Sequence, residues 1–299
     1  MDVAVSTLLS ARLLLSVAAS AWQKRLLRGA VDVGTLWGTA YLGLAGPAVV
    51  LLAAGWPGGV GGSFWVAAAA AGGMDALGNR ASGMALARSD LSVHGPLNAL
   101  RPALAAFLGA LLLGEYPGWL GGAGIVVTVG GTAWLWSPAR PGPPGAAGWV
   151  MGWRVAGLGL SVGAAALLKQ AVTGGGVAAT LAVWVLAGWG ALGVLWVLGM
   201  MAGWSSRGRS TLFRERRSGR GWWAELAGHG AVLGAMQAAT LAVLGAVPLA
   251  SAFVFFQLAM VLQVLVGRML FGERETARRL VACGVLCAGA AMVVADGAP

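Results

Sequence analysis

The sequence predicts an all-α polytopic membrane protein with ten transmembrane helices, arranged as two inverted five-helix repeats. Three observations lead to this fold class. Of the 299 residues, 58% are hydrophobic and only 10% are charged, whereas about 25% are charged in an ordinary soluble domain. The apolar residues gather into ten runs, most of them close to the roughly 20 residues that one spanning helix needs. Short stretches of the first half also recur in the second.

Many Trp residues lie near the ends of the expected spans, where an amphipathic ring is favoured at the level of the lipid headgroups. Many of the runs contain glycines, which allow neighbouring membrane helices to approach closely. Together the runs leave no stretch that could form a soluble catalytic domain. In chain order they cover residues 3–22, 33–54, 63–87, 92–114, 119–136, 152–170, 177–200, 223–244, 249–270 and 277–295.

The repeat is visible in two alignments of the halves. Residues 15–24 align with 160–169, so that Lys24 meets Lys169, and residues 101–115 align with 259–273. The stretch 137–148, rich in Pro and Gly, is interpreted as a connector between a first repeat (1–136) and a second (149–299). Because five is an odd number of spans, the second copy must cross the membrane upside down. Such inverted repeats are typical of secondary transporters, which bind substrate near the midplane.

The basic residues indicate an orientation. Of the 20 Lys and Arg residues, 16 lie beside odd-numbered loops and none beside even-numbered ones. The other four, within the spans, are Arg12, Arg80, Arg101 and Lys169. The positive-inside rule then places the odd loops in the cytoplasm and both termini on the other side. We therefore expect a multi-pass protein of the cell (inner) membrane whose partner is the lipid bilayer, and we expect no nucleic acid partner despite the net charge of +10.

A doubled motif carries a resemblance to a known family. An apolar helix, a Gly-Glu turn and a Gly-rich helix follow one another twice, with the turn at Gly114-Glu115 and again at Gly272-Glu273. Over nearly the whole chain this resembles the EamA-type transporters of the drug/metabolite transporter superfamily. The resemblance implies ten spans, a central cavity and export or exchange of a small metabolite. It also implies cytoplasmic termini, which is opposite to the orientation that the charges predict.

Several polar residues inside or at the ends of the apolar runs are candidates for substrate binding, because ionisable groups at membrane depth usually line a cavity or pair with a partner. Lys24 and Lys169, the only lysines, occupy equivalent repeat positions and could each attract an anionic group; ordinary anchoring at helix ends is the alternative. Asp75 and Arg101 could contact substrate or pair with each other. The full set of candidates is Lys24, Asp75, Asn79, Asn98, Arg101, Lys169, Gln237 and Gln257.

The remaining polar residues indicate structural roles or none. Glu115 and Glu273 are expected to cap the helices that follow them. His94 and His229 have no cysteine at metal-ligand spacing, so we expect no metal, and a phosphate-binding loop is absent from the sequence. Neither a cofactor nor an enzymatic activity is expected, because the acids and histidines are scattered.

The sequence thus predicts a secondary transporter, an exporter or exchanger, of a small polar metabolite that works by alternating access. The cationic groups at depth favour an anionic or zwitterionic substrate such as an amino acid or organic anion. A flippase-like carrier of a lipid-linked group and a drug exporter are the alternatives, with a membrane-embedded enzyme last. Coupling to a proton or another ion stays open, as does the choice between monomer and homodimer.

Overall fold

The structure is a computed structural model that describes residues 3–28, 33–53, 55, 58–87, 101–135, 146–201, 220–271 and 276–296. Within these ranges the regular structure is helical. The helices are α1 (Val3–Arg28), α2 (Val33–Ala53), α3 (Gly62–Ala87), α5 (Arg101–Leu108), η1 (Gly109–Leu113), α6 (Trp119–Leu135), α7 (Ala146–Met201), α8 (Arg220–Ala246), α9 (Leu249–Gln257), α10 (Ala259–Phe271) and α11 (Thr276–Asp296).

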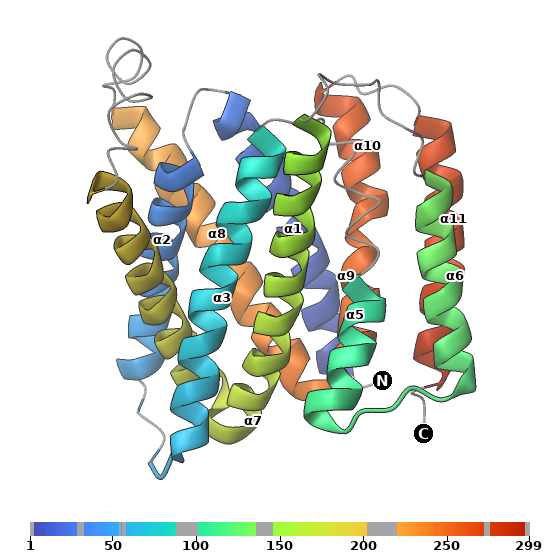
Figure 1. Ribbon diagram of the computed structural model, residues 1–299, viewed down its shortest axis with the longest axis horizontal. Coiled ribbons are helices and arrows are strands. Elements are labelled where there is room, and N and C mark those ends of the chain that lie inside the picture. Colours follow the sequence, from blue (N-terminus) through green and yellow to red (C-terminus); the bar gives the residue numbers. More distant parts are fainter. Residues whose placement is uncertain are drawn as a thin grey trace.

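The helices stand side by side with their long axes roughly parallel (Figure 1). α1 rises from the lower side of the view, α2 descends and α3 rises again, and this alternation continues along the chain (Figure 1). The first helix begins and the last helix ends at the same, lower side of the bundle (Figure 1). This is the arrangement expected of an even number of passes.

The long helix α7 is two helical arms joined at Gly176. This residue has φ 75° and ψ 173°, outside the helical region, and such a positive φ is accessible to glycine because it lacks a Cβ. The first arm descends and the second returns to the upper side (Figure 1). The arms correspond to the expected spans 152–170 and 177–200, so the sharp bend falls at the predicted boundary.

Four stretches of helix are long and apolar enough to cross a membrane: Val3–Leu26, Met151–Leu198, Trp223–Ala246 and Leu249–Leu270. Shorter apolar helices cover Leu36–Val50, Arg101–Leu113, Trp119–Gly131 and Leu280–Val293. The chain is therefore a helical protein of membrane type, as the composition predicts.

Two of the expected spans are not continuous α-helices. In the span expected at 249–270 the regular α-helical hydrogen bonding is interrupted at Leu258, between α9 and α10, although the φ of −58° and ψ of −26° at this residue are helical. In the span expected at 92–114, of which residues 92–100 lie outside the described ranges, α5 passes into the π-helical turn η1. This turn ends on Gly114, whose φ is 69°. π-Helical turns are frequent at functional sites.

Glycines bring the central helices into close contact. α3 packs against both arms of α7. A Cβ on Gly78 would lie 3.2 Å from the carbonyl oxygen of Gly157 in the first arm, and one on Gly72 would lie 3.0 Å from the backbone nitrogen of Gly188 in the second. The main core, which includes Tyr41, is formed by residues of α1, α2, α3, α5, α7, α8 and α9. α6 and α11 pair with each other beside this core (Figure 1).

Candidate functional site

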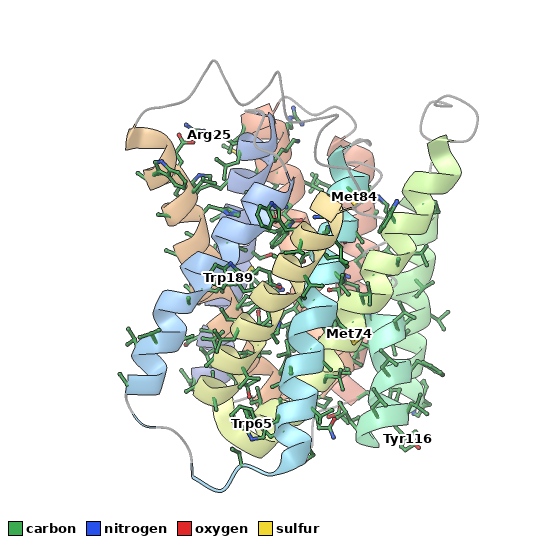
Figure 2. All side chains as sticks on the ribbon, turned by 60° about the vertical axis from the view of Figure 1, so that its left-hand side comes forward. Arg25, Trp65, Met74, Met84, Tyr116 and Trp189 are labelled. Atoms are coloured by element: carbon green, nitrogen blue, oxygen red, sulfur yellow. The ribbon has the colours of Figure 1, made fainter. Side chains whose placement is uncertain are left out.

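A buried carboxylate lies at the middle of the bundle. Asp75 on α3 is 8% exposed, and its neighbour Met74 lies between Trp65 at the lower end of α3 and Met84 near the upper end (Figure 2). Its Oδ2 accepts two hydrogen bonds, one from the hydroxyl of Tyr41 on α2 at 2.9 Å and one from Nδ2 of Asn79 at 2.9 Å. Asn79 reaches the carboxylate because it follows one helical turn later on the same face.

Arg101, the first residue of α5, brings a positive charge towards this carboxylate. Its guanidinium lies within electrostatic range of the carboxylate of Asp75. Nε of Arg101 is buried and has no hydrogen-bond partner among the described residues. Asn98, the remaining candidate of this region, lies outside the described residues.

A second arginine joins the cluster from α1. Cζ of Arg12 lies 3.6 Å from the centroid of the Phe256 ring on α9, and its Nε donates a long hydrogen bond of 3.4 Å to Oγ1 of Thr240 on α8. Arg12 and Arg101 are close enough to repel each other electrostatically. The cluster therefore contains two guanidinium groups and one carboxylate, supported by a phenol and an amide.

Lys169 has a different environment at the turn between α8 and α9. Its Nζ lies 2.5 Å from Oε1 of Glu115 and donates a hydrogen bond of 2.6 Å to the carbonyl oxygen of Val247. The other oxygen of Glu115, Oε2, accepts a 2.7 Å hydrogen bond from the backbone N–H of Leu249, the first residue of α9. The ammonium is thus neutralised within the chain, and this favours a structural role for Lys169.

Glu115 caps the N-terminus of α9, because its carboxylate accepts a hydrogen bond from the first N–H of that helix. The sequence predicted instead that Glu115 would cap α6, the helix that follows it directly. The pairing could not be read from spacing, because 134 residues separate Glu115 from Leu249. Its counterpart Glu273 lies outside the described residues.

The other candidates are dispersed. Lys24 is half-buried in the last turns of α1, and Gln237 is half-buried on α8. Gln257 is 7% exposed at the end of α9, next to Phe256. The structure thus brings Asp75, Asn79 and Arg101 together, and it pairs Lys169 with another carboxylate, that of Glu115.

Tyr41, Arg12 and Phe256 join the cluster without having been among the candidates. Arg12 carried a usable signal, since a basic residue near the middle of an apolar run is expensive in a membrane. Tyr41 and Phe256 carried none, because aromatic residues are common in membrane helices for packing alone.

Comparisons with known proteins add the fold and no more. No family model matches the sequence, and no curated protein matches it. The crystal structure of another protein is similar to this one, with a TM-score of 0.70 and 16% sequence identity. The similarity covers 99% of this chain and 98% of the other chain. The full-length overlap means that the helical arrangement described above is a fold also found in a protein solved by crystallography.

Proposed function

We propose that the chain is a secondary transporter, an exporter or exchanger, that carries a small anionic or zwitterionic metabolite by alternating access. In this proposal the described helices belong to ten spans that form two inverted five-helix repeats, similar to the EamA-type transporters. The observation that carries the proposal is the buried polar cluster of Asp75 where the two halves of the chain meet. An ionisable group at membrane depth indicates a functional site by default.

The glycine contacts support the repeat. The alignments that pair residues 15–24 with 160–169 and 101–115 with 259–273 also pair Gly43 with Gly188 and Gly72 with Gly230. A Cβ on Gly43 would lie 2.5 Å from Cα of Gly230, and one on Gly188 would lie 3.2 Å from the carbonyl oxygen of Gly72. A contact between the halves therefore recurs with the repeats exchanged, as a pseudo-two-fold axis requires.

Helix pairing follows the same exchange. α1 and α2 pack on α8, and the two arms of α7 pack on α3. α6 and α11, the last helices of the two proposed repeats, pack on each other. Two units that meet through equivalent surfaces can rock against each other around a central site, which is the usual basis of alternating access.

The position of the carboxylate fits a site between such units. Asp75 lies on α3 between Gly72 and Gly78, and both glycines contact α7 of the other half. The hydrogen-bond donors of Tyr41 and Asn79 come from the same half as Asp75. Polar groups that can serve a substrate thus lie beside the surface on which the halves would move.

The decisive test is exchange in proteoliposomes. The purified chain is reconstituted, loaded with one of a panel of unlabelled amino acids and organic anions, and diluted into a trace of the labelled compound. A secondary transporter should accumulate label transiently by counterflow, whereas protein-free liposomes should not.

A reversible tether between the halves tests the mechanism. Oε1 of Glu225 on α8 lies 3.0 Å from Nη2 of Arg25 on α1, at the upper end of the bundle (Figure 2). With Cys283 and Cys287 replaced, the pair Arg25→Cys and Glu225→Cys should be joined by a bifunctional methanethiosulfonate reagent that spans the length of the two replaced side chains, because a direct disulfide needs a closer approach of the backbones. The tether should block counterflow, and its reduction should restore counterflow. Each single cysteine variant is the control, and full counterflow in the cross-linked double variant would contradict movement between these helices.

A further inference from the structure

The charges of the central cluster do not balance. Arg12 contacts Phe256 of α9, and α9 packs on α5, the helix that begins with Arg101. The two guanidinium groups lie within electrostatic range of each other, and Arg101 lies within range of Asp75. Among the described residues this group therefore carries two positive charges and one negative charge. An uncompensated charge is costly in a region of low dielectric. The cluster is therefore suited to receive one further anion.

We propose that Arg12 and Arg101 form a subsite for a single oxyanion, and that the transported compound is a monoanion bound through a carboxylate or a similar group. The inference rests on the proposed transport function and narrows its substrate class from anionic or zwitterionic to anionic. It assigns recognition to two arginines at mid-depth rather than to the lysines.

The donors needed for such a group are present. A guanidinium has five N–H donors in a planar fork that fits an oxyanion with two parallel hydrogen bonds. The described hydrogen bonds of Arg12 use only its Nε. On Arg101, Nε is buried without a partner among the described residues. Two arginines with unused donors lie within electrostatic reach of each other.

Asp75 is poorly suited to hold a cationic group of the substrate. Its Oδ2 already accepts hydrogen bonds from Tyr41 and Asn79, and its charge attracts Arg101. A substrate ammonium would have to compete with these contacts while it was repelled by two guanidinium groups. Asp75 is therefore a positioning residue that orients Arg101, not a contact for the substrate.

Phe256 defines one side of the subsite. Its ring lies against the face of the Arg12 guanidinium, which shields that face from other ligands and leaves the edge donors available. The contact also crosses between the halves of the chain, because Arg12 belongs to the first and Phe256 to the second.

The proposed anion subsite occurs once per chain, although the chain is proposed to consist of two structural repeats. The alignments pair Arg12 with Gly157 and Arg101 with Ala259, so the second half has no arginine at either equivalent position. We therefore expect one anion per chain.

The test compares four probes that share a chain of four carbon atoms, on the intact protein in lipid nanodiscs: butyrate, butyramide, butylammonium and the zwitterion 4-aminobutyrate. Affinity is read from the concentration dependence of the thermal unfolding midpoint, at constant ionic strength. Butyrate should stabilise the protein saturably and more strongly than 4-aminobutyrate, and the other two should not. Arg12→Gln and Arg101→Gln should each weaken butyrate binding at least about tenfold.

Three further variants separate recognition from folding. Arg12→Lys should retain part of the affinity, because it keeps the charge and loses the fork. Asp75→Asn should bind butyrate more tightly, because it removes a competing negative charge. Arg268→Gln, the same change at an exposed position of α10, should bind like the parent protein. Monodispersity of each variant by size-exclusion chromatography shows that it has folded.

Three results would overturn the inference: stabilisation by butylammonium, the absence of any effect of butyrate, or butyrate affinity in both glutamine variants equal to that of the parent protein. The counterflow assay distinguishes a failure of the anion subsite from a failure of the proposed transport function. Arginine-dependent anion binding without counterflow of any compound would support the subsite and refute transport. Counterflow of cations alone would support transport and refute the anion subsite.

Discussion

At the scale of single residues, Lys169 and Glu115 connect three parts of the chain that are far apart in sequence. The ion pair is largely buried, with the side chains 11% and 25% exposed, and Glu115 also receives the first N–H of α9. Removing one partner leaves the other charge without compensation. We expect Lys169→Gln and Glu115→Gln each to destabilise the protein by roughly 2–3 kcal/mol, somewhat below the 3–5 kcal/mol typical of fully buried pairs.

Thermal unfolding in detergent, followed by tryptophan fluorescence, measures this effect. The double variant should be clearly less destabilised than the sum of the single variants, because the second change removes the unpaired charge. The control is the exposed pair Arg25–Glu225, with side chains 72% and 32% exposed, where Arg25→Gln should cost no more than about 1 kcal/mol. Strict additivity at Lys169 and Glu115 would show that the pair contributes little.

Asn79 allows a test of whether the central cluster is reached by water. With Cys283 and Cys287 replaced, a cysteine at Asn79 should react with a small hydrophilic thiol reagent in membranes, since polar groups at this depth need water or a partner. The matched control is a cysteine at Val126, which is 71% exposed on the outer face of α6. There the surrounding lipid should suppress formation of the reactive thiolate. Equally poor labelling at both positions would count against a water-filled site.

At the scale of helices, the close contacts of glycines predict which glycine-to-alanine substitutions destabilise the protein. Gly43→Ala would place a Cβ 2.5 Å from Cα of Gly230, and Gly188→Ala would place one 2.5 Å from Cε1 of Tyr41. Each change should destabilise the protein by about 1–3 kcal/mol, because neighbouring helices must separate. Unfolding midpoints in detergent measure the effect.

Neighbouring glycines on the same helices provide the controls. A Cβ on Gly38 of α2 or on Gly190 of α7 would have nothing within 4 Å. Alanine there should be neutral or stabilising by up to about 1 kcal/mol, because alanine is the better helix former. Similar losses at all four positions would mean that the glycines act through backbone flexibility and not through close packing.

Helix positions followed from the sequence because they depend on local composition. An apolar run of spanning length can satisfy its backbone in a membrane only as a helix, so the bend at Gly176 and the direction of each helix were predictable. The breaks at Leu258 and after Leu108 were not, since the residues there are ordinary helix formers. The cluster was predicted in part: charged groups at depth stand out in a sequence, whereas Tyr41 and the cap at α9 depend on tertiary contacts.

At the scale of the whole molecule, the open question is which side faces the cytoplasm. The first helix begins and the last helix ends on one side of the bundle (Figure 1), so in the proposed ten-span arrangement both termini share a compartment. The positive-inside rule assigns the opposite side to the cytoplasm, because most of the basic residues follow helices that end there. A fluorescent protein that folds only in the cytoplasm should therefore be dark when fused after Pro299 of the intact chain.

The same reporter fused after Arg274, between α10 and α11, supplies the matched control. One pass fewer should place it on the cytoplasmic side, and it should be bright at comparable expression.

The arginines of the stretch 202–219 allow a second test of the orientation. Replacing Arg207, Arg209, Arg214, Arg216 and Arg217 by Gln removes five of the 16 loop charges. This change should reduce the charge difference between the two sides of the membrane and produce mixed orientation. A bright reporter after Pro299 together with a dark one after Arg274 would show that the termini are cytoplasmic, and that factors other than loop charge set the orientation of this fold.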